Sequence, residues 1–247
     1  MNRVSAAIGR KLAASVRTKG LRIRPERGIV SFTFDDAPRS SLTNGARLLE
    51  AAGACGTYYV AGDLVDGESE GRPYLTRDDL AWLNERGHEL ACHTFSHARV
   101  PEMDAATLGA ELDRNQTFVA DACGDTRLTS FAYPFGDVSP ARKLQAQARF
   151  ASCRGITPGV NRGVADLGLL KAVALYGRSR DDAALRGWLE ETERCRGWLI
   201  LYTHDVDDEP TEWGASVDQL EAAIGDCMTR GFEILTVRNA LGRLAFS

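Results

Sequence analysis

Short apolar segments rich in β-branched and aromatic residues alternate with helix-like segments through most of the chain. The predicted strands cover residues 29–34, 56–60, 88–92, 128–133, 198–202 and 233–237, with weaker candidates at 150–153 and 171–176. The predicted helices cover residues 42–52, 76–86, 105–122, 181–195 and 217–229, and a further helix begins after Ser139. Apolar strands separated by helices are typical of a parallel sheet covered on both faces. We therefore expect an α/β fold, a closed or nearly closed barrel of about seven parallel strands in a single domain.

The first 27 residues differ from the rest of the chain in charge. They contain eight basic residues and one acidic residue, whereas the whole chain carries a net charge of −4. Val4, Ile8, Leu12 and Val16 recur every fourth residue, which predicts a short amphipathic helix. We divide the chain into a basic extension, residues 1–27, and a catalytic unit, residues 28–247. The helix could pack against the body of the protein, make a peripheral contact with an anionic membrane surface, or join subunits in an oligomer of unknown size.

Composition excludes several other classes of protein. The negative net charge argues against general nucleic-acid binding, which requires a basic surface. The chain has no run of about 18 apolar residues, the length that a membrane-spanning helix needs. Six scattered cysteines without a CxxC pair indicate reduced thiols, and the N-terminal segment is a poor secretory signal. We expect a cytoplasmic protein, with a peripheral position at the inner membrane face as the alternative.

Polar residues that could act in catalysis or bind a metal ion follow four of the predicted strands. They are Asp35 with Asp36, His93 with His97, the segment 133–136, and His204. The carboxyl ends of barrel strands meet on one rim, where α/β barrels carry their active sites. Two histidines spaced four residues apart, joined by one carboxylate, form the ligand set of a catalytic zinc site. We expect the fourth histidine, His88, at the surface.

Together these segments resemble the polysaccharide deacetylases, also known as carbohydrate esterase family 4 or NodB-homology domains. Residues 33–37 resemble the first family motif, TFDDG, and residues 93–97 match the second, H[ST]xxH. Residues 132–135 take the place of the third motif, RxPY, and residues 201–204 match the fifth, LxxH. The motifs follow in the family order with similar spacing, and the resemblance runs from about residue 28 to residue 237.

The resemblance implies a distorted (β/α) barrel that hydrolyses an N-acetyl group on a sugar. We extend the expected substrate class to an N-acetylated oligosaccharide or a lipid-linked glycan. The resemblance also implies one divalent metal ion, with zinc expected, bound by Asp36, His93 and His97. Such an ion polarises the amide carbonyl and lowers the pKa of a bound water toward about 7.

The resemblance further implies the roles of the residues that act on the substrate. Asp35 would be the general base and His204 the general acid. The backbone N–H of Phe135 would help to hold the oxyanion, with Tyr133 beside it in the same motif. Leu201 would line the pocket for the acetyl group.

The sequence departs from the family pattern in three places. Ala37 replaces the glycine of the first motif. Ala132 replaces the third-motif arginine that braces the catalytic aspartate in the family, and Arg178 or Arg162 could take over its role. The fourth motif does not align, and Asp166 is the nearest candidate for its aspartate.

The residues leave two other functions open. One is hydrolysis of a different non-peptide C–N bond, such as that of a cyclic amide, and the other is a non-catalytic module that binds a metal or a glycan. A glycan hydrolase should show an open groove with exposed aromatic side chains, whereas a small-molecule amidase should show a closed pocket. The chain has no GxSxG elbow, no glycine-rich phosphate loop and no HExxH motif, so other hydrolase and nucleotide-binding patterns are poorly supported.

Overall fold

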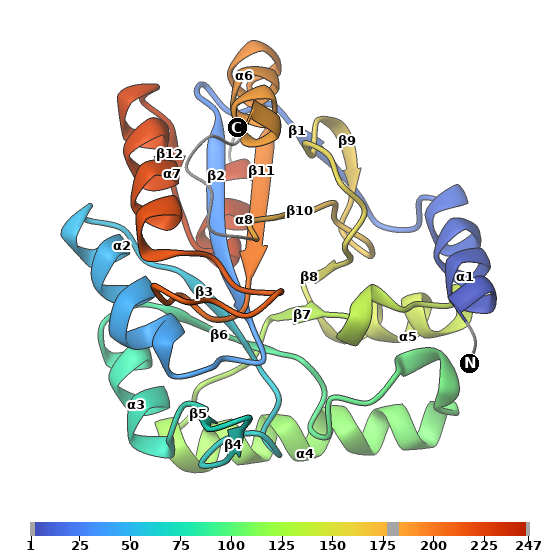
Figure 1. The fold of residues 1–247 in the computed structure, drawn as a ribbon. Coiled ribbons are helices and arrows are strands. Elements are labelled where there is room, and N and C mark those ends of the chain that lie inside the picture. Colours follow the sequence, from blue (N-terminus) through green and yellow to red (C-terminus); the bar gives the residue numbers. More distant parts are fainter. Residues whose placement is uncertain (1–2, 177–182, 246–247) are drawn as a thin grey trace.

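The computed structural model describes residues 3–176 and 183–245, and its centre is a curled parallel sheet (Figure 1). One path of seven strands runs through this sheet in the order β10–β11–β2–β3–β6–β7–β8, and each neighbouring pair is parallel. The bounds are Val173–Ala174 (β10), Trp198–Thr203 (β11), Ile29–Asp35 (β2), Thr57–Val60 (β3), Glu89–Cys92 (β6), Ser130–Ala132 (β7) and Ser152–Arg154 (β8). The predicted distorted barrel of about seven parallel strands is confirmed.

The sheet curls into a barrel. This barrel is incomplete because β8 and β10, the two ends of the strand path, are joined only by a short bridge. Leu170, which precedes β10, forms an isolated parallel bridge with Arg154 at the end of β8. The Leu170 N–H donates to the Cys153 carbonyl at 2.8 Å, and its carbonyl accepts from Gly155 at 2.9 Å. This bridge brings the end of β8 to the same rim as the ends of β2 and β11.

Helices cover the outside of the curled sheet (Figure 1). Their bounds are Arg47–Ala51 (α2, which continues a π-helical turn, Ser41–Ala46), Arg77–Glu85 (α3), Ala105–Cys123 (α4), Pro140–Arg149 (α5), Ala183–Cys195 (α6), Val217–Thr229 (α7) and Val237–Ala245 (α8). At the start of α3, the Thr76 hydroxyl accepts from the Asp79 N–H at 3.1 Å, and the Asp79 carboxylate accepts from the Thr76 N–H at 2.9 Å. This capping box fixes where the helix begins, at the start of the helix predicted over residues 76–86.

Alternation along β2 decides which of its side chains face the barrel interior. Phe32 and Phe34 belong to the large outer core, which also contains Leu220 of α7. On the other face, the Ser31 hydroxyl accepts from the Trp198 indole at 2.9 Å inside the sheet. Because side chains alternate along a strand, Asp35 shares the inner face with Ser31. The strand therefore delivers a carboxylate to the interior end of the barrel.

The sequence did not predict three features of the fold. β1 (Gly20–Ile23) pairs antiparallel with β9 (Gly163–Asp166), and β4 (Glu68–Ser69) forms a hairpin with β5 (Arg72–Pro73). β12 (Glu233–Ile234) pairs with β2 but is shorter than the strand predicted over residues 233–237. That strand ends early because Val237 begins α8, whose first N–H groups donate to the Thr57 hydroxyl and the Glu89 carboxylate.

His88 lies in the core, and the prediction of a surface position was wrong. The residue is 1% exposed, and its Nδ1 accepts the Gly56 N–H at 3.0 Å. Burial lowers the pKa of His88, so the ring is neutral at neutral pH and can accept this bond. Its role is to satisfy a buried backbone donor at the start of β3.

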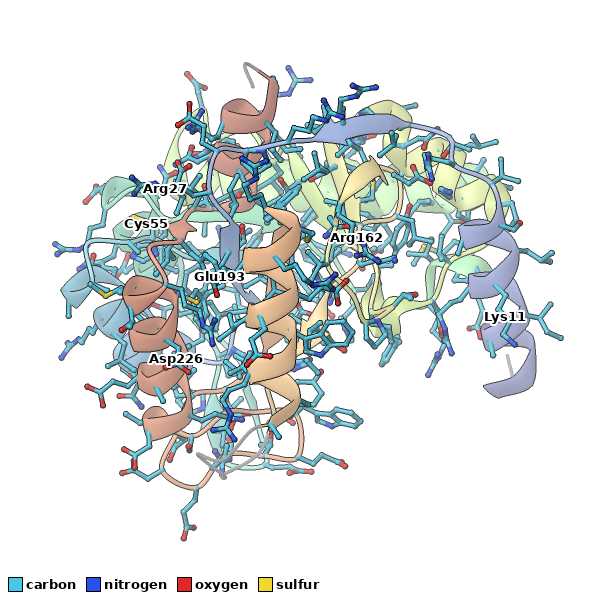
Figure 2. The ribbon with its side chains drawn as sticks, turned by 90° about the horizontal axis from the view of Figure 1, so that it is seen from above. Lys11, Arg27, Cys55, Arg162, Glu193 and Asp226 are labelled. Carbon is cyan, nitrogen blue, oxygen red and sulfur yellow. The ribbon has the colours of Figure 1, made fainter. Side chains whose placement is uncertain are left out.

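The predicted amphipathic helix near the N-terminus is present as α1 (Arg3–Ser15). It lies at the periphery of the molecule against α5, away from the central strands (Figures 1 and 2). Among the described residues, no helix combines the length and the apolar character needed to cross a bilayer.

Candidate metal centre and active site

Two adjacent aspartates leave the end of β2 in different directions. Asp35 is the last residue of the strand and is 5% exposed. Asp36 and Ala37 have φ angles of 60° and 58°, and the Ala37 N–H donates to the Asp35 carbonyl at 2.6 Å. Residues other than glycine seldom adopt a positive φ angle. This tight turn sends Asp35 into the barrel and Asp36 toward the histidines that follow β6.

The same unusual backbone conformation occurs at the ends of two neighbouring strands. Thr94 and His97 after β6 have φ angles of 60° and 51°, and Phe135 after β7 has a φ of 59°. Each such residue costs of order 1–3 kcal/mol and persists only where its surroundings enforce it. Five of the eight non-glycine residues with positive φ among the described residues follow β2, β6 and β7, which makes this rim a candidate functional site.

Asp36, His93 and His97 come together as the sequence predicted. Their ligand atoms all lie within 4.8 Å of one another. The Asp36 Oδ1 atom lies 3.1 Å from Nε2 of His97 and 3.5 Å from Nε2 of His93. A divalent cation could therefore be held by one carboxylate and two imidazoles, with positions left open for other ligands.

The protonation of His93 indicates that a cation belongs between these atoms. Burial lowers the pKa of His93 to about 4, so the ring is neutral at neutral pH. Nδ1 of the ring lies 2.8 Å from the Ala132 carbonyl, which can only accept, so Nδ1 carries the proton. Nε2 then points a lone pair at Asp36 Oδ1, which is buried and has no hydrogen-bond partner. Two acceptors facing each other in a buried site fit a metal ion.

Asp35 is held by an arginine that the sequence analysis did not select. Nη2 of Arg154 donates to both Asp35 oxygens, at 2.5 and 2.6 Å, and Arg154 is 1% exposed. Its guanidinium lies between two tyrosine rings, 4.8 Å from the Tyr59 centroid and 4.9 Å from the Tyr202 centroid. Burial is the largest single influence and would raise the pKa of Asp35, but the Arg154 charge and hydrogen bonds, together with the nearby His93 and His204, outweigh burial and lower that pKa. Asp35 is therefore an ionised carboxylate at neutral pH.

Arg154 provides the positive charge beside Asp35 that the third motif lacks. Ala132 on β7 is the register partner of Arg154 on β8, so the arginine reaches Asp35 from the neighbouring strand. Arg162, one of the two expected replacements, is exposed and forms an ion pair with Glu191 at 3.2 Å. Arg178, the other, lies outside the described residues. The sequence offered one signal that could have identified Arg154. It directly follows the strand predicted over residues 150–153, as the other polar site residues follow theirs.

His204 follows β11 and faces the same rim. Its Nε2 lies 3.8 Å from Asp36 Oδ2, and its Nδ1 lies 3.1 Å from the Trp213 carbonyl. That carbonyl can only accept, so it fixes the proton on Nδ1 and orients Nε2 toward the cleft. Asp205, 2% exposed, accepts from the Thr211 N–H at 2.8 Å and from the Thr211 hydroxyl, which holds the loop that carries Trp213. A backbone carbonyl therefore orients His204.

Asp166, the candidate for the fourth-motif aspartate, lies elsewhere. It belongs to β9 and forms an ion pair with Lys143 of α5 at 2.6 Å. It also accepts from the backbone N–H groups of Lys19 and Gly168. This carboxylate fastens the N-terminal segment to the body and makes none of its contacts with His204.

The remaining predicted substrate residues are divided between the rim and the core. Phe135 is 47% exposed, and its ring centroid lies 4.6 Å from that of His97. Tyr133 is 1% exposed, and its hydroxyl donates to the Gly168 carbonyl at 3.1 Å. Leu201 belongs to the outer core, because alternation along β11 gives the inner position to Tyr202. The placements of Tyr133 and Leu201 do not fit the predicted substrate contacts, whereas Phe135 lies beside the histidines.

An open cleft leads to Asp36 and His204. It has a volume of about 490 Å³, and its lining includes Asp36, His204, Tyr74 and Trp213. The β4–β5 hairpin contributes a wall, and Trp213 is 53% exposed. An open cleft with exposed aromatic side chains is the form expected for a glycan enzyme, because aromatic faces pack against the apolar faces of sugar rings.

Comparison with known proteins assigns the family. The family model described as polysaccharide deacetylase matches residues 22–151. The chain belongs to the polysaccharide deacetylase family. The matched region contains the turn at Asp35 and Asp36, both histidines of the second motif, and the segment around Phe135. The resemblance inferred from the motifs is thereby confirmed.

Individual members of the family share the fold at low sequence identity. A chitin deacetylase from Pestalotiopsis sp. is 26% identical over 94 residues, which are 38% of this chain and 30% of that protein's length. A family 4 acetyl xylan esterase from Clostridium thermocellum, solved with a cobalt ion, has a TM-score of 0.61 at 19% identity, over 87% of this chain and 90% of its own. A family 4 carbohydrate esterase from Bacillus subtilis has a TM-score of 0.62 at 14% identity, over 94% of this chain and 88% of its own.

Proposed function

We propose that this polysaccharide deacetylase uses one divalent metal ion, with zinc expected, to hydrolyse an N-acetyl group on a sugar, an oligosaccharide or a lipid-linked glycan. One observation carries the proposal. The buried Asp36 Oδ1 faces the lone pair of a neutral His93, beside an aspartate that Arg154 keeps ionised. That combination provides a cation site and a base in the same cleft. The cobalt ion reported for the Clostridium thermocellum relative supports a divalent ion in this fold.

We assign the metal to Asp36, His93 and His97. When bound, the ion would polarise the acetyl carbonyl and make water acidic enough to lose a proton near neutral pH. His93 serves this purpose because its Nδ1 proton is fixed by the Ala132 carbonyl, which keeps Nε2 free as a donor of electrons. The ends of β2 and β6, on either side of β3, hold the three side chains without help from the substrate.

We assign proton transfer to Asp35 and His204. Asp35 accepts the proton of the attacking water, and Arg154 keeps it ionised until that step. His204 delivers a proton from Nε2 to the departing amine, with its ring orientation fixed by the Trp213 carbonyl. We assign stabilisation of the oxyanion to the backbone N–H of Phe135, in a turn where this residue has a φ of 59°. Asp35 and His204 thus act as base and acid in one reaction.

The open cleft favours a glycan over a small cyclic amide. Trp213 and Tyr74 lie beside His204, and Phe135 lies beside His97 at the rim. The chitin deacetylase named above supports an N-acetylated amino sugar as the substrate class.

The test of this proposal is acetate release from defined substrates. We expect the zinc- or cobalt-loaded protein to release acetate and expose free amines in equal amounts from N-acetylglucosamine oligomers. Acetylated xylan serves as the ester comparison, and a cyclic ureide serves as the test of ring opening. Acetate from xylan alone would contradict the amide assignment. Ring opening without acetate would replace the proposal with the cyclic-amide alternative, and inactivity of a metal-loaded protein on all three would favour a binding module.

A further inference from the structure

The face of α1 that packs against the protein is made of small and polar residues. A side chain at Gly9 would begin 3.0 Å from the Val138 carbonyl oxygen, and Ala13 is 2% exposed. Lys143 of α5 donates to the carbonyls of Ala13 and Val16, both at 2.6 Å. Arg10 pairs with the buried Asp137 at 2.5 Å. These contacts fix the rotation of the helix on the body of the protein.

This rotation turns the apolar stripe of α1 outward. Ile8 is 54% exposed, Leu12 is 55% exposed, and Val16, just after the helix, is 61% exposed. In an ordinary surface helix, such an apolar stripe packs against the core of the protein. Because the opposite face makes the packing contacts, these aliphatic side chains are left facing solvent.

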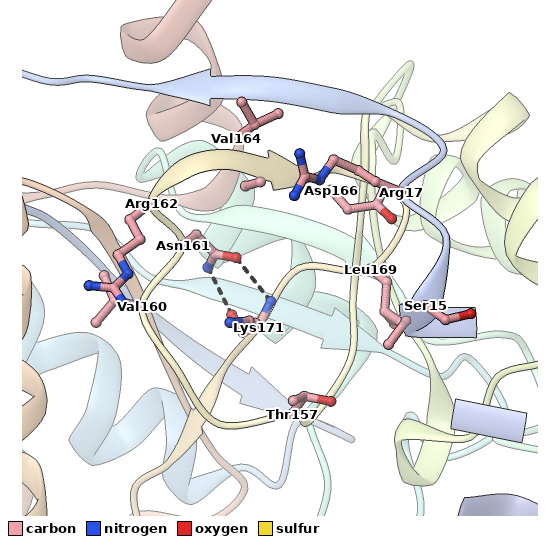
Figure 3. A pocket seen from close by; sticks show the side chains of 12 residues that line it. Ser15, Arg17, Thr157, Val160, Asn161, Arg162, Val164, Asp166, Leu169 and Lys171 are labelled. Carbon is pink, nitrogen blue, oxygen red and sulfur yellow. Dashed lines mark hydrogen bonds between the residues drawn. The ribbon is translucent and has the colours of Figure 1, made fainter. Parts of the chain in front are cut away.

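Basic residues flank the stripe. Lys11 lies within α1 and extends away from the body of the protein, and Arg17 follows the helix (Figure 2). Ser15, three residues after Leu12 on the same face, lines a pocket of about 330 Å³ that Arg17, Arg162 and Lys171 also line (Figure 3). Its acidic member, Asp166, is neutralised by Lys143, and Arg162 is paired with Glu191, so Arg17 and Lys171 give the pocket its positive charge. The surface therefore combines an aliphatic stripe with an adjoining cationic pocket.

We propose that α1 and this pocket form a docking surface for anionic phospholipid. The stripe of Ile8, Leu12 and Val16 enters the outer acyl region, while Lys11, Arg17 and Lys171 face the phosphate groups. The charge argues against a second copy of this chain that docks through the same face, because Lys11, Arg17 and Lys171 would then meet their own copies. Two such faces meeting each other would repel. This inference goes beyond the proposed deacetylation and does not depend on it.

Removing α1 would be a poor test because the helix is tied to the active-site rim. Asp137, the partner of Arg10, also pairs with Arg99, whose guanidinium lies 4.2 Å from the centre of the Phe135 ring. A truncation would take Arg10 from Asp137 and two carbonyl acceptors from Lys143, and it would disturb the contacts that reach the turn at Phe135 through Arg99. Substitutions on the exposed stripe leave all of these contacts in place.

The experiment is sedimentation of the full chain with vesicles of phosphatidylcholine alone, or with an equal share of phosphatidylglycerol. We expect binding only to the anionic vesicles, weakened by salt, and reduced about tenfold or more when Ile8, Leu12 and Val16 are all replaced by glutamine. Met228→Gln, which changes a residue of equal exposure on α7, is the matched control and should bind normally. Circular dichroism should show the same thermal unfolding for both variants.

Four results would overturn the proposal. The unchanged protein could fail to bind anionic vesicles, or bind neutral vesicles equally well. The triple variant could bind as strongly as the unchanged protein. Light scattering could show a dimer that the triple variant separates, which would make the stripe an interface between copies. None of these measurements uses a sugar substrate, so failure here is distinct from failure of the deacetylase assignment.

Discussion

Asp35→Asn should lower the rate of deacetylation by about 10²–10⁴-fold while the protein keeps its metal ion. Asparagine removes the base but leaves an oxygen that can accept from Arg154. Asp36, His93 and His97 are unchanged, so metal content should stay at the level of the unchanged protein. The measurement is the initial rate of acetate release together with the metal content of the same sample.

The neighbouring aspartate provides the matched control. Asp36→Asn should lose both activity and metal, because its Oδ1 atom faces both histidine Nε2 atoms. The two adjacent substitutions are therefore expected to differ in metal content. An Asp35→Asn protein with normal activity would refute its role as the base, and equal loss of metal in both variants would refute the division of labour between them.

Arg154→Met should destabilise the protein and change its dependence on pH. Removing one partner of a buried ion pair costs about 3–5 kcal/mol of folding free energy, because the other charge stays buried. With Arg154 present, the pKa of Asp35 lies below its usual value, so the stabilisation is present above the unfolded-state pKa and disappears as the pH falls through the folded-state pKa. Without Arg154, burial raises that pKa, and the acid limb of the rate profile should move to higher pH.

The control for this variant is Arg162→Met. Arg162 is exposed and pairs with Glu191, so its loss should change stability by less than about 1 kcal/mol. Chemical denaturation and a pH–rate profile measure both effects. An Arg154→Met protein with unchanged stability and an unshifted acid limb would contradict the role of Arg154, whereas an effect of the same size in Arg162→Met would make the result nonspecific.

The sequence predicted the elements that depend on local signals. The alternation of apolar strands with amphipathic helices determines the parallel sheet, and Thr76 with Asp79 marks the start of α3 through bonds within one turn. The carboxyl-end rule for parallel strands then placed Asp36, His93 and His97 on one rim, where they are found together. These inferences needed no knowledge of which strands are neighbours.

What escaped prediction depends on contacts between distant residues. Arg154 can reach Asp35 only because β8 lies beside β7 with Ala132 and Arg154 in register, and pairing of that kind leaves no local trace in the sequence. The Leu201 assignment failed for a related reason, since one step along β11 exchanges the inner face for the outer one. For α1, the sequence predicted the apolar stripe but not whether the stripe is buried. Its periodicity was plain, but the contacts of Gly9, Arg10 and Ala13 decide which face is buried.

The metal content of the purified protein tests the central claim most directly. Elemental analysis should find about one zinc or similar divalent ion per chain in the unchanged protein and in His204→Ala, since His204 is assigned to proton transfer. His93→Ala and His97→Ala should lose the ion, and the less buried His97 guards against a folding defect in the first variant. That pattern would support the site as described. A folded, unchanged protein that contains no metal and takes up neither zinc nor cobalt would contradict the account.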